Sequence, residues 1–196
     1  MRQFVILGHD APRTPDFPLD DLPGAAGRLD VLCRCVTAGL LTSHGIRDDT
    51  RITVIIQNEL ILSFDGATLR NLHPDERSTA ARFRDALADA ENAVGAMAVE
   101  SSPGVTIRHG GLADVLAEAP SPIVQLDPDG EPIQSLGLPD SVTFLLSDHR
   151  PFSPEDIDRM EGMIAKRCSL GPVAIHADQA ITVAHHYLDT AGYQHY

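Results

Sequence analysis

Apolar and polar positions alternate along the first half of the chain in patterns that predict a strand, a helix and a hairpin. Residues 4–7 are apolar and partly β-branched, and Gly8 stops the run, which is typical of a buried strand. Residues 27–44 repeat apolar side chains every three or four positions and therefore predict an amphipathic helix. The runs 51–57 and 60–64 flank a short polar link, which favours a hairpin.

The second half of the chain alternates short apolar runs with helical periods. We expect strands at 105–108, 123–126 and 142–146, and helices at 74–94, 112–116, about 154–166 and about 177–189. Ser153 suits the N-cap of the helix that begins at 154, because Pro154 is tolerated at a first helical position. Strands that alternate with helices favour an α/β fold with a mostly parallel sheet flanked by helices.

Composition adds that the chain can build a substantial hydrophobic core. It has 196 residues, of which 43% are hydrophobic and 5% aromatic, and its mean hydropathy is -0.07. These values exclude the disordered, collagen-like and membrane-embedded classes. We expect one domain over residues 1–196, with a separate small lobe at about 44–100 as the open alternative.

The charge balance of the chain is unusual. Its 28 acidic residues oppose 15 basic ones, which gives a net charge of -13, and Lys166 is the only lysine. By charge alone, such a chain is not expected to bind nucleic acid. The same composition also keeps a protein surface hydrated in molar salt, so the acidity can report the solvent instead of the partner.

Cysteine and histidine usage does not suggest a disulfide framework or a metal site. Cys33, Cys35 and Cys168 are odd in number, and a Cys-x-Cys pair without companions lacks zinc-site spacing. His185 and His186 would lie about 100° apart on a helix and cannot easily share one metal ion. The apolar run near the N-terminus is too short for a signal peptide or a membrane span, so we expect a cytoplasmic protein.

Candidate chemistry is concentrated where the predicted strands end. The sequence contains no phosphate-binding glycine loop, dinucleotide fingerprint, metalloprotease motif or hydrolase elbow. Small or polar residues follow the runs at 123–126 and 142–146 and lie beside Cys168. Because ligands of open α/β sheets bind outside the carboxyl ends of the strands, these exits predict a pocket. The alternative is that Asp148 only caps a turn and Gly171-Pro172 only bends the chain.

Five segments together carry a family resemblance. They are LPGAAGRLDVLCRCV at 22–36, NLHPDERSTA at 71–80, SSPGVTIR at 101–108, LLSDHR at 145–150 and LGPVAIHADQAITVAHHYLD at 170–189. In this order, they resemble the archaeal tRNA pseudouridine-54 N1-methyltransferases of the SPOUT superfamily. The resemblance implies S-adenosyl-L-methionine-dependent N1-methylation of pseudouridine 54 in the T-loop of tRNA. Two alternatives stay open: a pseudouridine N1-methyltransferase for another RNA, and a non-catalytic cofactor-binding dimer that interacts with RNA.

The resemblance also implies a fold and an assembly. Its members have an α/β domain with a C-terminal trefoil knot, an exception to the rule that chains do not thread loops. They form homodimers through the knot region and hold S-adenosyl-L-methionine bent among three loops. Carried over by position, the cofactor contacts fall on Leu126, Ser147, Leu170, Gly171, Pro172, Val173, Ala174, Ile175 and Ala180.

Catalytic and RNA-binding candidates complete this interpretation. Asp148 is expected to orient or deprotonate N1 of the target base, with His149 as a neighbouring donor. Arg28, Arg34 and Arg77 are expected either to contact RNA phosphates and the target nucleotide, or to form internal ion pairs.

Two positions depart from the pattern of many relatives, which have glycine at 147 and cysteine at 180. Ser147 adds a hydroxymethyl group beside the cofactor, and Ala180 excludes a cysteine nucleophile at that position. Methyl transfer to N1 needs no covalent enzyme intermediate. With the resemblance, the net charge of -13 indicates a halophilic archaeal cytoplasm, where the Debye length is about 3 Å at 1 M salt.

Overall fold

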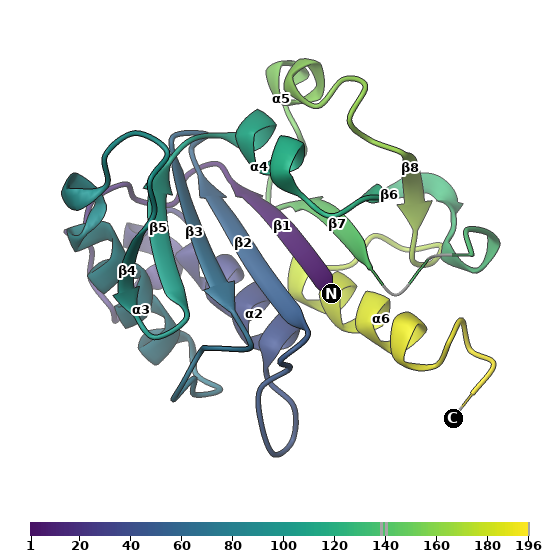
Figure 1. The fold of residues 1–196 in the computed structure, drawn as a ribbon, viewed down its shortest axis with the longest axis horizontal. Helices are drawn as coiled ribbons and strands as arrows, with labels where there is room; N and C mark the ends of the chain where they lie inside the picture. Colours follow the sequence, from purple (N-terminus) through teal and green to yellow (C-terminus); the bar gives the residue numbers. More distant parts are fainter. Residues whose placement is uncertain (138, 140, 196) are drawn as a thin grey trace.

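A mixed β-sheet forms the centre of the protein (Figure 1). The computed structural model describes residues 1–137, 139 and 141–195, and this part of the chain contains eight strands in the order β4-β5-β3-β2-β1-β7-β6-β8. The strands are β1 (Arg2–Gly8), β2 (Thr50–Ile56), β3 (Leu60–Asp65), β4 (Val99–Ser102), β5 (Val105–His109), β6 (Ile123–Pro132), β7 (Val142–Ser147) and β8 (Lys166–Ser169).

The direction of strand pairing divides the sheet into two parts. β1 pairs in parallel with β2 on one side and with β7 on the other, and β6 pairs in parallel with both β7 and β8. The pairs β2–β3, β3–β5 and β4–β5 are antiparallel. Within the described residues, four of the seven pairings are therefore parallel, which confirms the predicted mostly parallel sheet. The antiparallel part grows from the predicted hairpin, because a short link can only join antiparallel neighbours.

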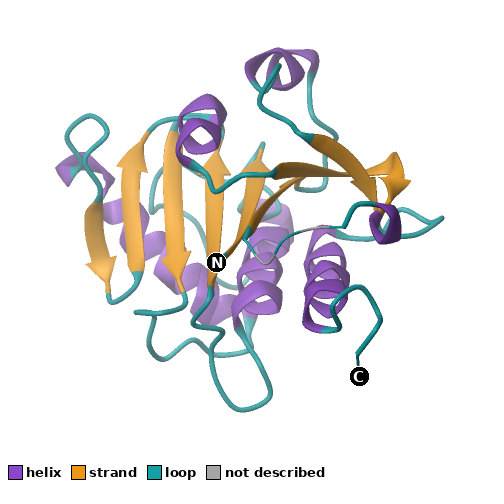
Figure 2. Cartoon of the chain, turned by 45° about the vertical axis from the view of Figure 1, so that its right-hand side comes forward, coloured by secondary structure: helices purple, strands orange, loops and turns teal. Residues whose placement is uncertain are grey.

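Helices cover both faces of the sheet (Figure 2). They are α1 (Leu22–Ala25), α2 (Leu29–Leu40), α3 (Glu76–Ala88), α4 (Leu112–Glu118), α5 (Pro154–Arg159) and α6 (Ala177–Asp189). Alternate side chains of β1 point to opposite faces: Phe4 and Ile6 pack with α2, α3 and α6, whereas Val5 and Leu7 pack with α4 and with Met160 after α5. The central strand is thus buried on both faces, as its continuous apolar run predicts.

Three predicted helices are shorter than the sequence pattern suggests. The expected helix at 27–44 begins only at Leu29, because Gly27 and Arg28 have left-handed φ values of 54° and 62°. α3 ends at Ala88 instead of 94. α5 ends at Arg159 instead of about 166, since the chain turns through Gly162 at a φ of 74° and then begins β8. β4 was not predicted, because its four residues are only partly buried or exposed.

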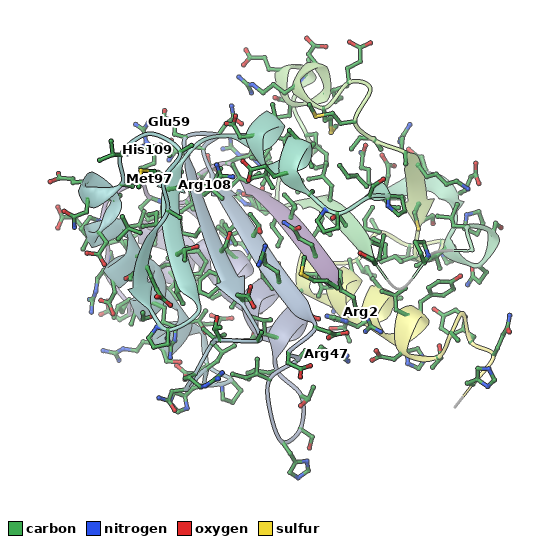
Figure 3. All side chains as sticks on the ribbon, viewed as in Figure 1. Arg2, Arg47, Glu59, Met97, Arg108 and His109 are labelled. Carbon is green, nitrogen blue, oxygen red and sulfur yellow. The ribbon has the colours of Figure 1, made fainter. Side chains whose placement is uncertain are left out.

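Charged side chains join the two ends of the chain. The Asp189 carboxylate, on the last residue of α6, accepts hydrogen bonds from Arg2 and from Arg47, whose Nη2 lies 2.6 Å from Oδ2. Figure 3 shows Arg2 and Arg47 side by side next to α6. Burial alone would raise the pKa of Asp189, but the two guanidinium groups outweigh it and hold this pKa at about 2. The first strand is therefore fixed to the last helix.

The last strand, β8, pairs with its neighbour β6 at two separate places. Leu126 of β6 pairs with Cys168, and Glu131 pairs with Cys168 again after the intervening segment has curved away. Gly130 lies against the backbone of β8 at this crossing, so closely that a Cβ atom there would lie 2.5 Å from the amide nitrogen of Cys168. The residues between Leu126 and Glu131 therefore bulge out of the strand pair and return so close to β8 that Gly130 has no room for a side chain.

We expect Gly130→Ala to lower the free energy of unfolding by about 1–3 kcal/mol, because the added methyl group would push two backbone segments apart. Chemical denaturation measures the change. Gly45→Ala is the matched control, since the nearest atom to its added Cβ is the Thr42 hydroxyl at 3.8 Å. Equal stability of the two variants would contradict the tight crossing.

Candidate functional site

A cleft of about 1030 Å³ opens where β6, β7 and β8 end and α6 begins. Leu126 on β6, Ser147 at the end of β7 and Leu170 directly after β8 line it together. These three strands run parallel, so their carboxyl ends meet at one edge of the sheet. A cleft of this size at strand ends is typical of a small-molecule or cofactor site.

The cleft contains most of the residues that the sequence assigned to a cofactor. Pro172 is the exception, since it lies exposed in the same loop without lining the cleft. An added Cβ at Gly171 would meet nothing within 4 Å, so the backbone there faces open space. The predicted residues that do line the cleft are Leu126, Ser147, Leu170, Gly171, Val173, Ala174, Ile175 and Ala180.

Asp148 lies at the edge of this cleft with its side chain only 2% exposed. Its Oδ1 accepts hydrogen bonds from the ring of His9 at 2.9 Å and from the backbone N–H of Arg150 at 2.9 Å. Burial would raise the pKa of Asp148, but these hydrogen bonds outweigh it and keep the pKa below its usual range. The carboxylate is therefore an ionised acceptor that also caps a turn, which makes it better suited to orienting a donor than to removing a proton.

His9 is a residue of the site that sequence reasoning missed. It follows β1 directly, in a segment that was expected to be a loop, and its backbone N–H donates to Asp148 Oδ2 at 2.8 Å. The hydrogen bond to Asp148 raises the pKa of His9 above its usual value, although burial acts in the opposite direction. Only the pairing of distant strands places His9 in the site. Leu7 is paired with Ser147, so the residues that follow β1 and β7 must be neighbours.

The predicted basic residues lie in different surroundings. Arg28 lines the cleft, and its Nε and Nη2 bind the two oxygens of Asp30 at 3.0 and 3.2 Å. Arg34 donates from Nη1 to Asp30 and to Glu76, both at 2.9 Å. Arg77 is exposed on the first turn of α3. The internal ion pairs that were the alternative for Arg28 and Arg34 are therefore present.

Asp30 organises this charge cluster from a buried position. Its side chain is 4% exposed and accepts from both Arg28 and Arg34. Burial would raise the pKa of Asp30, yet the two guanidinium groups lower it overall. The carboxylate consequently fixes the guanidinium of Arg28 at the wall of the cleft, on a residue whose backbone already has the unusual φ of 62°.

Two further predicted histidines, His185 and His149, lie in different surroundings. His185 is buried and its Nε2 lies 3.0 Å from the carbonyl oxygen of Gly39. Burial and then the charges of Arg47 and Arg2 lower its pKa to about 4. The predicted neighbouring donor, His149, places its Nε2 3.3 Å from Asp10.

The described residues contain neither a cluster of metal ligands nor a membrane-spanning helix. Among the described residues, no group of three or more histidine, cysteine, aspartate or glutamate side chains is arranged to hold a metal ion. No helix in the same residues is long and apolar enough to cross a bilayer. The three cysteines are free and buried, and burial raises the pKa of Cys168, which lines the cleft, to about 12.

Sequence comparison identifies relatives of this chain that match it over nearly its whole length. Residues 1–193 match the family described as "Putative SAM-dependent RNA methyltransferase". The chain is 52% identical to the tRNA (pseudouridine(54)-N(1))-methyltransferase of Haloarcula marismortui and 51% identical to that of Haloferax volcanii, with both chains covered completely in each case. It is 39% identical to the corresponding enzyme of Methanococcoides burtonii, over 96% of each chain.

Structural comparison supports the same architecture. The crystal structure of Archaeoglobus fulgidus Nep1 bound to S-adenosylhomocysteine superimposes with a TM-score of 0.65. The match covers 99% of each chain at 14% sequence identity, so it establishes the fold.

Removal of the central carboxylate tests the charge cluster. We expect Asp30→Asn to lower the free energy of unfolding by about 3 kcal/mol, because Arg28 and Arg34 would then lose their buried counter-charge. Denaturant titration measures the change. Asp20→Asn alters an exposed carboxylate and should stay within about 0.5 kcal/mol of the wild type. A similar small effect at Asp30 would show that the cluster is not held by this residue.

Proposed function

Since the chain belongs to the archaeal tRNA (pseudouridine(54)-N(1))-methyltransferase family, we propose that it methylates N1 of pseudouridine 54 in tRNA with S-adenosyl-L-methionine. The cleft at the ends of β6, β7 and β8 is the observation that carries this function, because it joins a cofactor-sized space to a buried, ionised carboxylate. When bound, the cofactor supplies a methyl group on a positively charged sulfur.

The residues present fit such a cofactor. The segment 170–175 brings backbone groups and small side chains to the cleft, and Ala180 and Leu126 add apolar walls. Backbone N–H and C=O groups can bind adenine and ribose, whereas apolar walls exclude water from the methyl group. Ser147 does not block the space, since its hydroxyl is turned to the carbonyl oxygen of Arg150. We propose that Pro172, which lies exposed in the same loop as residues 170–175, also contacts the cofactor.

Asp148 is proposed to orient the target base. Its hydrogen bonds use part of the acceptor capacity of the carboxylate, which has about four lone-pair sites. A remaining site can accept the N1–H of pseudouridine and align N1 with the methyl group. The N1–carbon bond forms as the carbon–sulfur bond breaks, S-adenosylhomocysteine leaves, and the N1 proton passes to solvent. Ala180 takes no part in bond formation, as this reaction needs no thiol.

Basic side chains are proposed to hold the RNA. Arg28 at the cleft wall is suited to the target nucleotide, and Arg34 lies behind it in the Asp30 cluster. Arg77 is exposed on the first turn of α3, where its charge interacts with that of Asp75. On the same helix, Arg82 donates to the carbonyl oxygens of Arg70 and Asn71, each at 2.7 Å. Such cations are available for phosphate oxygens, which arginine binds through two hydrogen bonds.

The C-terminal part is proposed to be a trefoil knot and the surface for homodimer formation. The return of residues 130–132 to β8 after the bulge supports the knot. Ile157, Val173 and Ile175 line the cleft and are 53%, 70% and 43% exposed, which supports a partner surface that covers the open side of the cleft. We retain the proposals of one domain over residues 1–196 and of a salt-rich cytoplasm, the latter supported by the net charge of -13.

The direct test uses two transcripts of one tRNA that differ only at position 54. With pseudouridine there, incubation with S-adenosyl-L-methionine in molar KCl should yield N1-methylpseudouridine by mass spectrometry. With uridine there, no methylation is expected, because its N1 carries the glycosidic bond. Methylation of a different pseudouridine-containing RNA, and not of this tRNA, would show that the proposed substrate is wrong. Binding of S-adenosylhomocysteine without methylation of any RNA would favour a non-catalytic module.

Asp148→Asn should lower the single-turnover rate at saturating cofactor by about tenfold or more, because a neutral amide orients N1–H poorly. Saturation removes any effect of the substitution on cofactor affinity from the rate. Asp158→Asn, at an exposed position of α5, is the matched control and should keep the wild-type rate. A wild-type rate in Asp148→Asn would exclude the orienting role.

A further inference from the structure

The imidazole ring of His9 lies between two carboxylates. Nδ1 is 2.9 Å from Oδ1 of Asp148, and Nε2 is 3.3 Å from Oδ2 of Asp156. A neutral imidazole has one donor and one acceptor nitrogen, so only the protonated ring can donate to both carboxylates. The side chain of His9 is 16% exposed, and those of Asp148 and Asp156 are 2% and 6% exposed. The geometry therefore requires a largely buried imidazolium.

This ring connects both ends of one cleft segment to the central strand. Asp148 begins the segment that leaves β7, and Asp156 lies in the first turn of α5, where that segment ends. Asp156 Oδ2 also accepts from the backbone N–H and the hydroxyl of Ser153, which completes the helix cap. Between these two anchors, His149, Pro151 and Phe152 line the cleft. Neither Asp156 nor His9 lines the cleft, so both act on it through Asp148 and this segment.

Other charged groups surround the ring from each element. Asp10 next to His9 binds the guanidinium of Arg150 at 2.9 Å and lies 3.3 Å from His149. The remaining charges are Arg28, which interacts with Asp148, and Arg159 and Glu155 on α5. Arginine stays charged at any relevant pH, and the carboxyl pKa values of Asp148 and Asp156 are lowered. His9 is therefore a group of this cluster whose charge can change near neutral pH.

We propose that protonated His9 is a positioning residue of the methyl-transfer site, which holds residues 148–153 in the shape that binds the cofactor. The inference rests on the proposed function, because it concerns affinity for S-adenosyl-L-methionine and its product. Loss of the proton leaves a lone pair facing a carboxylate at one of the two contacts. His9 then loses its hydrogen bond to Asp148 or to Asp156 at one end of the segment, and the wall of the cleft loses its support.

The pH dependence has a definite sign. Hydrogen bonding to Asp148 raises the pKa of His9 above 6.5, so the favourable charge is fully present below that pH. It is lost as pH rises through the raised value. Cofactor affinity should therefore decrease at alkaline pH, and by reciprocity the bound cofactor should raise the pKa of His9 further.

Calorimetry with S-adenosylhomocysteine tests this in the full-length protein. The wild-type Kd should increase about fivefold or more between about pH 6 and about pH 9. His9→Gln should bind about fivefold more weakly at pH 6 and show no change over this range. Asp156→Asn, at N3 of α5, keeps a side-chain oxygen that can accept from the N–H of Ser153 but removes one carboxylate, so its loss of affinity should begin at lower pH than in the wild type. His44→Gln, on an exposed loop far from the cleft in sequence, should follow the wild-type curve.

If His9→Gln does not fold, a measurement on the wild-type protein still tests the proposal. Nitrogen-15 NMR of the imidazole should give a His9 midpoint above 6.5 that rises when S-adenosylhomocysteine is added. A midpoint that the ligand does not change, or a His9→Gln curve parallel to that of the wild type, would overturn the positioning role. Failure of the wild type to bind S-adenosylhomocysteine at any pH would instead contradict the proposed function itself.

Discussion

The parallel register of β1 with its two neighbours is the constraint on which the site depends. β1 pairs with β2 and β7 at once, and Leu7 lies opposite both Ile55 and Ser147. Because all three strands run in the same direction, their carboxyl ends share one edge of the sheet. This register places His9 beside Asp148 and orders the segment that forms the cleft wall. A shift by one residue would turn the apolar side chains of β1 to the wrong faces and separate these two residues.

Short-range ion pairs explain how so acidic a chain remains compact. Asp30 is buried against Arg28 and Arg34, while Asp189 accepts from Arg2 and Arg47. Contacts of this kind act at distances near 3 Å, where salt screens them far less than it screens charges separated by a Debye length. The planar guanidinium also forms two parallel hydrogen bonds, which a lysine ammonium group cannot do. The use of arginine in place of lysine thus suits both the ion pairs of the structure and the salt-rich cytoplasm that we propose.

Local sequence patterns predicted the parts of the site that depend on one element. The strand exits at Leu126 and Ser147 could be located because each ends an apolar run, whereas their assignment to a cofactor, like that of Gly171, came from the family resemblance. The helix α6 was bounded correctly by its own periodicity. His9 could not be found, because its partner Asp148 is 139 residues away and only the sheet register brings them together. The early end of α5 was missed for a similar reason, since the pairing of β8 with β6 overrides the helical period.

The position of β1 also has a consequence for synthesis of the protein. The first strand to leave the ribosome becomes the middle of the sheet, and its partner β7 ends only at Ser147. Until that residue emerges, one edge of an apolar strand has unpaired backbone groups that other chains could bind. The nascent chain must therefore remain soluble in this incomplete state, and its acidic side chains keep it hydrated even in molar salt. The negative charge then protects the protein before it has folded as well as afterwards.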